Sequence, residues 1–577
     1  MLPQFGRIAI APEDTADSSD RAHTGVGRLS LLRHLDAIRD LTDMRAFLAL
    51  TLAFPIATLS AQAPAWTRGA TCYEIFVRSF QDSDGDGIGD LRGLISRLDY
   101  INDGNPRTRT DLGARCLWLM PVAQSPSYHG YDATDYYTVE RDYGTNDDFK
   151  RLVSEAHRRG IKILVDMVLN HSSNEHPYFV ASARDTASPY RAWYRWSATQ
   201  PAQKHPWGGN STLWHRSSVR GDYYYGIFWS GMPDLNFENP AVREEAKKIA
   251  RFWLRDMDVD GFRLDAIPYL IEAGDSVAGT GGTHAFLREY QAYIKTIKPD
   301  VFTVGEVWDS VGAMLPYYPD QLDAHFAFEV ADKIIAGVRA GSARGMLAPS
   351  LRLQHAIPQW RWAPFLRNHD GTRTRTEFKG DLSRARIASF LMLTMPGLPF
   401  VYYGEEIGMI GDKPDERLRT PMQWTAAPGG GFTKGKPWER FQDDSARTTV
   451  AAQDKDPRSL LNLHRRLIPL RDENAALAAG ELVPLTASSD AVAAYLRVDG
   501  SNVVLAIANL GDSALANVRL SSPSAVLPPG QWRARALLGA EGAATLTVRP
   551  DGRIEGYVPL PRLASREGYL FALTGSR

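Results

Sequence analysis

The chain has 577 residues, of which 44% are hydrophobic and 23% are charged, a composition typical of soluble globular proteins. Its length exceeds that of one small domain, so about two or three domains are expected. The formal net charge is −1, which gives no reason to expect a nucleic-acid or other polyanionic partner.

An apolar segment near the N-terminus spans residues 46–61. It follows Met44 and Arg45 and ends in an Ala-Gln-Ala sequence at 61–63, the pattern of a secretory signal peptide. The segment is short and contains a proline, which argues against a transmembrane helix. We therefore expect a secreted or periplasmic protein without a membrane anchor. Residues 44–63 would be the signal peptide, cleaved after Ala63, and residues 1–43 an over-extended or disordered leader.

The two cysteines of the chain, Cys72 and Cys116, each begin a β-rich run. The runs continue through Tyr73–Val77 and Leu117–Met120, and in a parallel sheet they would be neighbouring strands. The cysteines form either a disulfide, in an oxidising compartment, or two buried free thiols. Neither a Cys-x-x-Cys pair nor a Cys/His metal spacing occurs, so no zinc site is expected.

An acidic, glycine-rich segment follows the first run. Its carboxylates alternate with other residues at Asp82, Asp84, Asp86 and Asp90, and the carbonyl of Ile88 offers a fifth oxygen. Alternating oxygen ligands separated by glycines wrap around a hard cation, as in calcium-binding loops. The pattern therefore predicts a structural Ca²⁺ bound by these five residues.

From Thr71 to about residue 470, β-rich runs alternate with helical stretches. The segment Arg151–Gly160 is one such helix with a glycine stop, and the run Ile161–Val168 follows it directly. This alternation indicates βαβ units and a parallel sheet. It is interrupted between His171 and Asn236, and a long irregular excursion of this kind is usually functional. From about residue 477 short strands separated by turns predict an all-β sandwich.

Four short segments end on polar residues that catalysis could use. They are Asp166–His171 (DMVLNH), Gly261–Ala266 (GFRLDA), Val304–Trp308 (VGEVW) and Phe365–Asp370 (FLRNHD). The first three follow β-rich apolar runs, and the C-terminal ends of parallel strands are where α/β barrels place their chemistry. Several carboxylates at one barrel mouth suit glycoside hydrolysis.

In their order, these segments resemble glycoside hydrolase family 13, the α-amylase family. The resemblance extends over roughly Trp66–Trp438 and includes Gly397–Glu405 at the last strand. It implies an α/β fold, a (β/α)8 TIM barrel with a small inserted domain B and a C-terminal all-β sandwich. The implied domains are barrel domain A at 64–171 and 237–476, domain B at 172–236 and domain C at 477–577.

The resemblance also implies roles for single residues. Asp265 would be the nucleophile, Glu306 the general acid/base, and Asp370 the group that stabilises the transition state. The Arg263 cation would keep Asp265 ionised, and Glu306 should have a pKa above that of a free glutamate. Substrate contacts would come from Tyr131, Asn170, His171, Arg263 and His369. Asp166 would not touch the substrate but would hold the Arg263 side chain in its orientation. The acidic loop resembles that of the oligo-1,6-glucosidase-like branch.

Two positions bear on specificity by resemblance. Ala266, after the proposed nucleophile, matches α-1,4-acting members. Exo-acting members close the cleft with an Asp–Arg pair; Arg419 matches the arginine, but Tyr128 stands at the aspartate position. We therefore expect a monomer that cleaves starch-like α-glucans internally. The alternatives are an exo-acting α-glucosidase, a transglycosylase such as a trehalose-forming enzyme, and a non-catalytic homologue, which should lack the catalytic acids.

Overall fold

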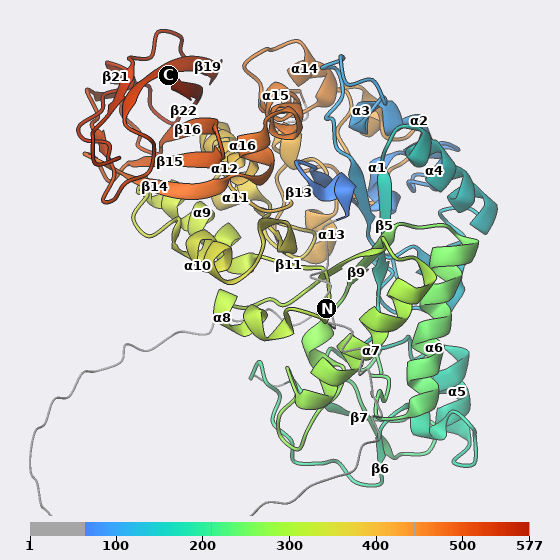
Figure 1. Ribbon diagram of the computed structural model, residues 1–577. Coiled ribbons are helices and arrows are strands. Elements are labelled where there is room, and N and C mark those ends of the chain that lie inside the picture. The colour runs from blue at the N-terminus through green and yellow to red at the C-terminus, as the bar shows by residue number, and fades with distance from the viewer. Residues whose placement is uncertain (1–63, 209–210, 443–445, 576–577) are drawn as a thin grey trace, which may run out of the picture. The chain divides into compact units, whose positions relative to one another are not determined.

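The computed structural model describes residues 64–208, 211–442 and 446–575 (Figure 1). The expected leader and signal peptide therefore lie outside the described residues. Within the described residues, no helix is long and apolar enough to cross a membrane.

Eight parallel strands form the central sheet, in the order β12-β11-β10-β9-β5-β2-β1-β13. They are β1 (Cys72–Ile75), β2 (Cys116–Leu119), β5 (Lys162–Met167), β9 (Gly261–Leu264), β10 (Phe302–Gly305), β11 (Ala324–Phe326), β12 (Trp362–Ala363) and β13 (Phe400–Tyr402). The outer strands are also joined, because the amide of Leu398 donates to the carbonyl of Trp362 at 2.9 Å. The sheet thus closes into the predicted barrel.

Helices alternate with these strands along the chain. The longer ones are α4 (Asn146–Arg158), α6 (Pro240–Arg251), α7 (Gly281–Ile297), α9 (Phe328–Ala340), α10 (Ala348–Ala356), α12 (Leu382–Thr394) and α15 (Leu460–Glu473). A capping box between Thr145 and Asp148 starts α4, and Gly160 adopts a φ of 73° just after its end. The helix and strand expected at Arg151–Gly160 and Ile161–Val168 are therefore confirmed as α4 and β5.

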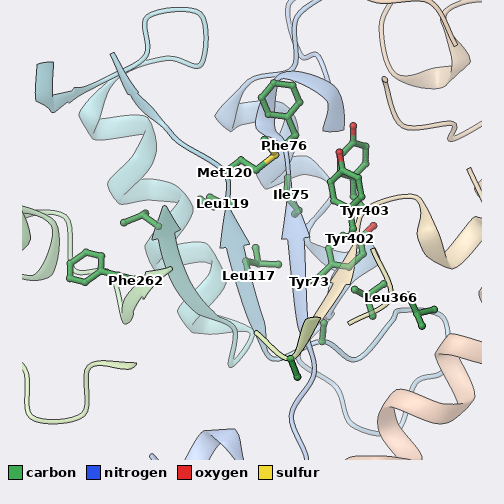
Figure 2. Close-up of a cluster of buried hydrophobic side chains, with 14 of the residues drawn as sticks. Tyr73, Ile75, Phe76, Leu117, Leu119, Met120, Phe262, Leu366, Tyr402 and Tyr403 are labelled. Carbon is green, nitrogen blue, oxygen red and sulfur yellow. The ribbon is translucent and has the colours of Figure 1, made fainter. Parts of the chain in front are cut away.

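Side chains of the barrel strands alternate between two cores. Tyr73 and Ile75 belong to the large outer core, where the strands meet the helices (Figure 2). Cys72 belongs to a separate inner cluster with Cys116 and Trp118. Cys72 and Cys116 are direct partners in the β1–β2 register and form a disulfide, so the alternative of two free thiols is wrong. The expected strand from Tyr73 to Val77 is shorter than predicted, because α1 (Val77–Phe80) begins there.

The stretch between β5 and α6 carries its own small elements. They are α5 (Pro177–Arg184) and an antiparallel sheet β6-β8-β7, formed by β6 (Trp196–Ser197), β8 (Tyr223–Tyr225) and β7 (Trp214–Arg216). A bridge between His171 and Asp234 closes this insertion at its base. The insertion thus starts and ends beside the C-terminal end of β5, on the side where the polar motif residues lie.

The C-terminal part is all-β, as predicted, and the strand pairs of its described residues are antiparallel. Its main sheet has the order β18-β14-β15-β16-β22-β19-β20, and β17 pairs with β21 in a second sheet. The strands are β14 (Glu481–Ala487), β15 (Val492–Asp499), β16 (Asn502–Asn509), β17 (Leu515–Ala516), β18 (Leu520–Ser521), β19 (Gly530–Leu538), β20 (Leu546–Val548), β21 (Arg562–Leu563) and β22 (Gly568–Gly575). They enclose a separate hydrophobic core.

Two fully buried arginines lie where this part meets the barrel, Arg497 in the C-terminal part and Arg471 in the barrel. Arg497 of β15 donates to the carbonyl oxygens of Thr394, at 2.7 Å, and Gly480, at 2.9 Å. Arg471 of α15 donates to the carbonyl of Met395 at 2.7 Å. Thr394 and Met395 lie at the C-terminus of α12, so both cations satisfy carbonyl groups that the helix leaves unpaired.

Candidate active site

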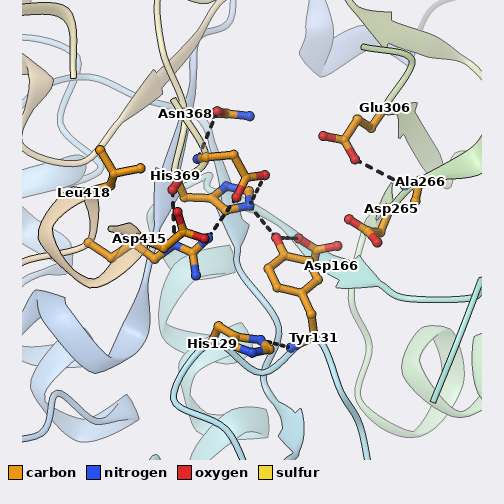
Figure 3. A network of polar contacts seen from close by, with 12 residues as sticks. His129, Tyr131, Asp166, Asp265, Ala266, Glu306, Asn368, His369, Asp415 and Leu418 are labelled. Atoms are coloured by element: carbon orange, nitrogen blue, oxygen red, sulfur yellow. Dashed lines mark hydrogen bonds and ion pairs between the residues drawn. The ribbon is translucent and has the colours of Figure 1, made fainter. Parts of the chain in front are cut away.

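One arginine organises three carboxylates at the C-terminal end of the barrel. The Arg263 guanidinium is 2.6 Å from Asp265 Oδ1, 2.7 Å from Asp166 Oδ1 and 2.8 Å from Glu306 Oε2. Arg263 lies in β9, Asp166 in β5, and Asp265 and Glu306 directly follow β9 and β10. Adjacent parallel strands therefore place these groups side by side, and Figure 3 shows Asp265 and Glu306 at one side of the network. The backbone amide of Ala266 also donates to Glu306 Oε2 at 3.2 Å.

A second cluster surrounds Asp370 on the opposite side of the mouth. Arg419 donates to Asp370 Oδ1 at 2.8 Å, and His369 Nε2 is 3.1 Å from Asp370 Oδ2. The other ring nitrogen of His369 contacts Glu74 Oε1 at 2.6 Å, inside the barrel. A buried cation thus faces Asp370 from each side.

Tyr131 links the two clusters. Its hydroxyl is 2.6 Å from His369 Nε2 and donates to Asp166 Oδ2 at 3.0 Å. The Tyr131 ring stacks on the His369 ring with a centroid distance of 5.5 Å. His129 accepts a hydrogen bond from the Tyr131 amide at 3.1 Å (Figure 3). The loop after β2 is therefore fixed against residues from β5 and from the segment after β12.

His171 and Asn170 lie at the junction with the insertion. His171 Nε2 donates to the carbonyl of Tyr131 at 3.1 Å, and both side chains are buried. The backbone amide of Leu235, in the insertion, donates to the carbonyl of Asn170 at 2.8 Å. The contacts of Asn170 therefore tie the insertion to the barrel, and its predicted contact with a sugar remains a prediction.

Burial sets the proton affinity of the paired acids. It raises the pKa of Asp265 to about 6, with the Arg263 cation opposing the shift. It raises the pKa of Glu306 to about 7, with Arg263 again opposing and the Asp265 anion adding to the shift. At neutral pH Asp265 is therefore ionised while Glu306 retains a substantial protonated fraction, in agreement with the expectation for Glu306.

The Asp370 cluster behaves in the opposite way. Burial alone would raise the pKa of Asp370, but the His369 and Arg419 cations hold it well below its usual range. Burial opposes the charge on His369, yet the Asp370 and Glu74 anions raise its pKa to about 9. In contrast, burial lowers the pKa of His171 to about 4, so that ring is neutral. The site thus combines a permanent anion at Asp370 with two acids that titrate near neutrality.

Comparisons with known proteins agree with this arrangement. The family described as "Alpha amylase, catalytic domain" matches residues 74–480. The chain belongs to the alpha-amylase family of glycoside hydrolases. It is 40% identical to Alpha-amylase 3 of Dictyoglomus thermophilum, over 77% of this chain and 85% of that protein. It is 31% identical to an oligo-1,6-glucosidase of Parageobacillus thermoglucosidasius, over 78% of this chain and 91% of that protein.

Trehalose-forming enzymes are also among the relatives of this alpha-amylase family member. The trehalose synthase/amylase TreS of Mycobacterium tuberculosis is 35% identical, over 78% of this chain and 82% of that protein. Among solved structures, the alpha-amylase from H. orenii has a TM-score of 0.75 and 38% identity, covering 88% of this chain and 99% of that one. The relatives therefore support the family and leave the reaction outcome open.

The acidic loop brings three of its predicted ligands together. Oxygens of Asp82, Asp84 and Asp86 lie within 4.8 Å of one another, which fits a hard cation. Asp90 lies outside this group, because its carboxylate caps α2 (Leu91–Ser96) by accepting from Gly93 and also accepts from the amide of Ser83. The ligand roles of Asp90 and Ile88 remain predictions.

Two functional contacts were not assigned from the sequence. Glu74 is an isolated acid within a buried strand, and only its 2.6 Å contact to His369 marks it as part of the site. Arg419 was noted for specificity, but its ion pair with Asp370 was not expected. A charged residue in an otherwise apolar barrel strand was the available signal for Glu74, since such charges are rarely buried without a partner.

Proposed function

We propose that this enzyme cleaves internal α-1,4-glucosidic bonds of starch, glycogen and maltodextrins, with retention of anomeric configuration. The observation that carries the proposal is the bridging of Asp265 and Glu306 by one guanidinium. Retaining enzymes need their two carboxyl groups close together, at roughly 5–5.5 Å. The ordered pKa values, about 6 for Asp265 and about 7 for Glu306, match a nucleophile and an acid.

In the first step, Glu306 donates its proton to the glycosidic oxygen while an Asp265 oxygen bonds to C1 of the sugar. The bond between C1 and the leaving oxygen breaks, and the shortened glucan departs with the proton. Arg263 keeps Asp265 anionic before the attack and remains beside it as its charge is consumed. In the second step, Glu306 removes a proton from water, the water oxygen bonds to C1, and Asp265 leaves as a carboxylate.

The remaining site residues hold the attacked sugar. Asp370 is anionic throughout and would accept hydrogen bonds from the 2- and 3-hydroxyls while stabilising the positive charge that develops on the ring. The Tyr131 ring would stack beneath the sugar, and His369, His171 and Asn170 would bind its hydroxyls. Asp166 would orient Arg263 from behind, through the 2.7 Å ion pair.

Internal cleavage is supported by the surroundings of Arg419. Tyr128 stands where exo-acting relatives would close the cleft with an aspartate, and its hydroxyl is 3.5 Å from Arg419. Arg419 pairs with Asp370 instead, at 2.8 Å. A half-buried tyrosine offers a face for a further sugar rather than a closed ion-pair barrier.

Export and calcium complete the proposal. Secretion, by the signal peptide from Met44 to Ala63, would bring the enzyme to polymers that cannot enter the cell. Ca²⁺ would be held by Asp82, Asp84 and Asp86, with Asp90 and the Ile88 carbonyl as the further predicted ligands. The bound ion would offset the mutual repulsion of the loop carboxylates.

The decisive assay compares two substrates for residues 64–577, with calcium present. One is a maltoheptaoside blocked at its non-reducing end, and the other is free maltose. We expect rapid cleavage of the blocked chain and little attack on maltose, with no activity in Asp265→Asn. Attack on maltose alone would identify an exo-acting α-glucosidase, and conversion of maltose to trehalose would identify a transglycosylase. Unchanged turnover in Asp265→Asn would refute the assigned nucleophile.

A further inference from the structure

Arg419, which pairs with Asp370, has a second carboxylate partner. The same guanidinium nitrogen, Nη2, lies 2.8 Å from Asp370 Oδ1 and 3.4 Å from Asp415 Oδ2, at the start of α13 (Asp415–Leu418). The Arg419 side chain is 1% exposed and that of Asp415 is 12% exposed, so solvent screens their attraction only weakly. Asp415 also forms an ion pair with Lys413, which is more exposed. Charges thus alternate from the active site to the surface, in the order Asp370, Arg419, Asp415 and Lys413.

Two chain segments exchange hydrogen bonds around this row of charges. Arg419 Nε donates to the carbonyl of His369 at 3.1 Å, and Arg373 Nε donates in the opposite direction to the carbonyl of Leu418 at 2.9 Å. The amide of Arg373 also donates to the carbonyl of Gly411 at 3.0 Å. The segment after β12 and the segment that contains α13 are therefore fixed to each other through their backbones. The ion pairs of Arg419 form between two segments that are already held in place.

The second partner of Arg419 limits how the first one can be bound. Nη2 carries two hydrogens, so it can donate one toward Asp370 and one toward Asp415. Without the Asp415 anion, both hydrogens could turn toward Asp370, since a guanidinium and a carboxylate favour paired, bidentate hydrogen bonds. The Asp370 carboxylate would then rotate to face Arg419, and its oxygens would no longer point toward a sugar.

We propose that Asp415 is a positioning residue of the reaction, which holds Arg419 so that the Asp370 carboxylate stays oriented toward the 2- and 3-hydroxyls of the attacked sugar. The inference rests on the proposed retaining mechanism, in which Asp370 stabilises the transition state through these hydroxyls. In Figure 3, Asp415 lies on the side of the network that holds His369, away from Asp265 and Glu306. Asp415 therefore acts through Arg419 and not on the two reacting carboxyl groups.

The test compares two substrates that differ only in one hydroxyl through which Asp370 would act. α-Glucosyl fluoride carries the 2-hydroxyl, and 2-deoxy-α-glucosyl fluoride lacks it. In Asp415→Ala, kcat/KM should fall about tenfold on the first substrate and no more than about threefold on the second. Any loss of folded protein lowers both rates equally, so it cancels in their ratio. Equal losses on the two substrates, or an unchanged rate on α-glucosyl fluoride, would overturn the positioning role.

Two further variants and one prior measurement complete the test. Glu416→Ala is the matched control, because Glu416 is the next residue of α13 and is not one of the carboxylates that pair with Arg419. Its rates should stay within about twofold of the wild type on both substrates. Asp415→Asn keeps an acceptor oxygen but no charge, so its ratio should lie between those of the wild type and Asp415→Ala; a ratio outside this range would contradict the proposal.

The proposed function is checked first, with Asp265→Asn on α-glucosyl fluoride. A wild-type rate in this variant would mean that the proposed mechanism itself has failed. A lost rate in Asp265→Asn, together with equal losses of Asp415→Ala on the two substrates, would contradict the role of Asp415 alone.

Discussion

Buried arginines occur in two regions of this molecule, and they do different things there. At the barrel mouth, Arg263 and Arg419 face carboxylates. At the junction with the C-terminal domain, Arg471 and Arg497 face carbonyl oxygens, and no ion pair with either is found among the described residues. All four side chains are buried to the same degree. The partners, and not the depth, distinguish the two regions.

The pKa shifts record this difference. Burial would lower the pKa of Arg263, but the Asp166 and Glu306 anions raise it well above its usual value. At the junction burial lowers the pKa of Arg471 to about 10, against a smaller opposing effect of Tyr495. At the mouth, the arginine charge therefore shifts the pKa values of the neighbouring carboxyl groups. At the junction, the arginine side chains instead donate several hydrogen bonds to carbonyl groups at the C-terminus of α12.

The largest expected effect is on activity at the mouth. Arg263→Met should reduce kcat by about a thousandfold or more, because Asp265 loses the cation that keeps it ionised and Glu306 loses the same neighbour. Steady-state kinetics on maltoheptaose would measure this. Arg471→Met is the matched control, and its folded fraction should retain wild-type kcat. Comparable losses of kcat in both variants would remove the distinction between the regions.

The next effect concerns stability at the junction. Arg497→Met removes the side-chain donor of the Thr394 carbonyl and one of the two side-chain donors of the Gly480 carbonyl, which keeps that of Gln359, so the free energy of unfolding should fall by roughly 2–4 kcal/mol. Chemical denaturation followed by circular dichroism measures the change, with Arg535→Met on the same β-domain as a control for removing an arginine. A variant of Arg497 as stable as the wild type would contradict the structural role.

The pH dependence of kcat/KM tests the proton affinities of the two acids at the mouth. In the proposed mechanism Asp265 must lose a proton and Glu306 must keep one, so kcat/KM should rise as pH increases through about 6 and fall above about 7. The two limbs belong to the coupled pair, so each reflects both acids. Glu306→Gln should abolish the alkaline limb of the residual activity. A flat profile between pH 5 and 9 would contradict these assignments.

A smaller effect is expected from Glu74→Gln. Loss of this anion should lower the pKa of His369, which is about 9, and kcat/KM should fall by about two- to tenfold. The loss should grow as pH rises, because the variant His369 ring gives up its proton at lower pH. Glu405→Gln, at another buried glutamate paired with Arg373, is the control. A loss that is equal at every pH would indicate that Glu74 acts only through packing.

The sequence was most informative where local pattern and tertiary position agree. Asp265 and Glu306 directly follow apolar strands. Adjacent parallel strands bring such residues together, independently of the conformation of the connecting loops. The length of the first strand was missed because Val77 continues its apolar run but belongs to a helical turn. The choice between a disulfide and free thiols needed the register that pairs Cys72 with Cys116.

Other contacts depend on distant segments and have no local signal. Glu74 and His369 are 295 positions apart, and Arg419 reaches Asp370 from a separate loop. The spacing of Asp90 predicts a metal ligand, which stays a prediction, but it gave no sign that the Asp90 carboxylate also caps the helix that begins directly after it. Residue type and spacing predicted the chemistry of the site, whereas the partners that tune its acids required the folded chain.

The most direct test of the account is to trap the covalent intermediate. The Glu306→Gln variant, treated with a 5-fluoroglycosyl fluoride, should gain the mass of one glycosyl group, because the reagent needs no acid to leave and deglycosylation lacks its base. Peptide mass spectrometry should place the group on Asp265. A group on Asp370 or Asp166, or no adduct while the reagent is still consumed, would contradict the role of the carboxylate beside Arg263.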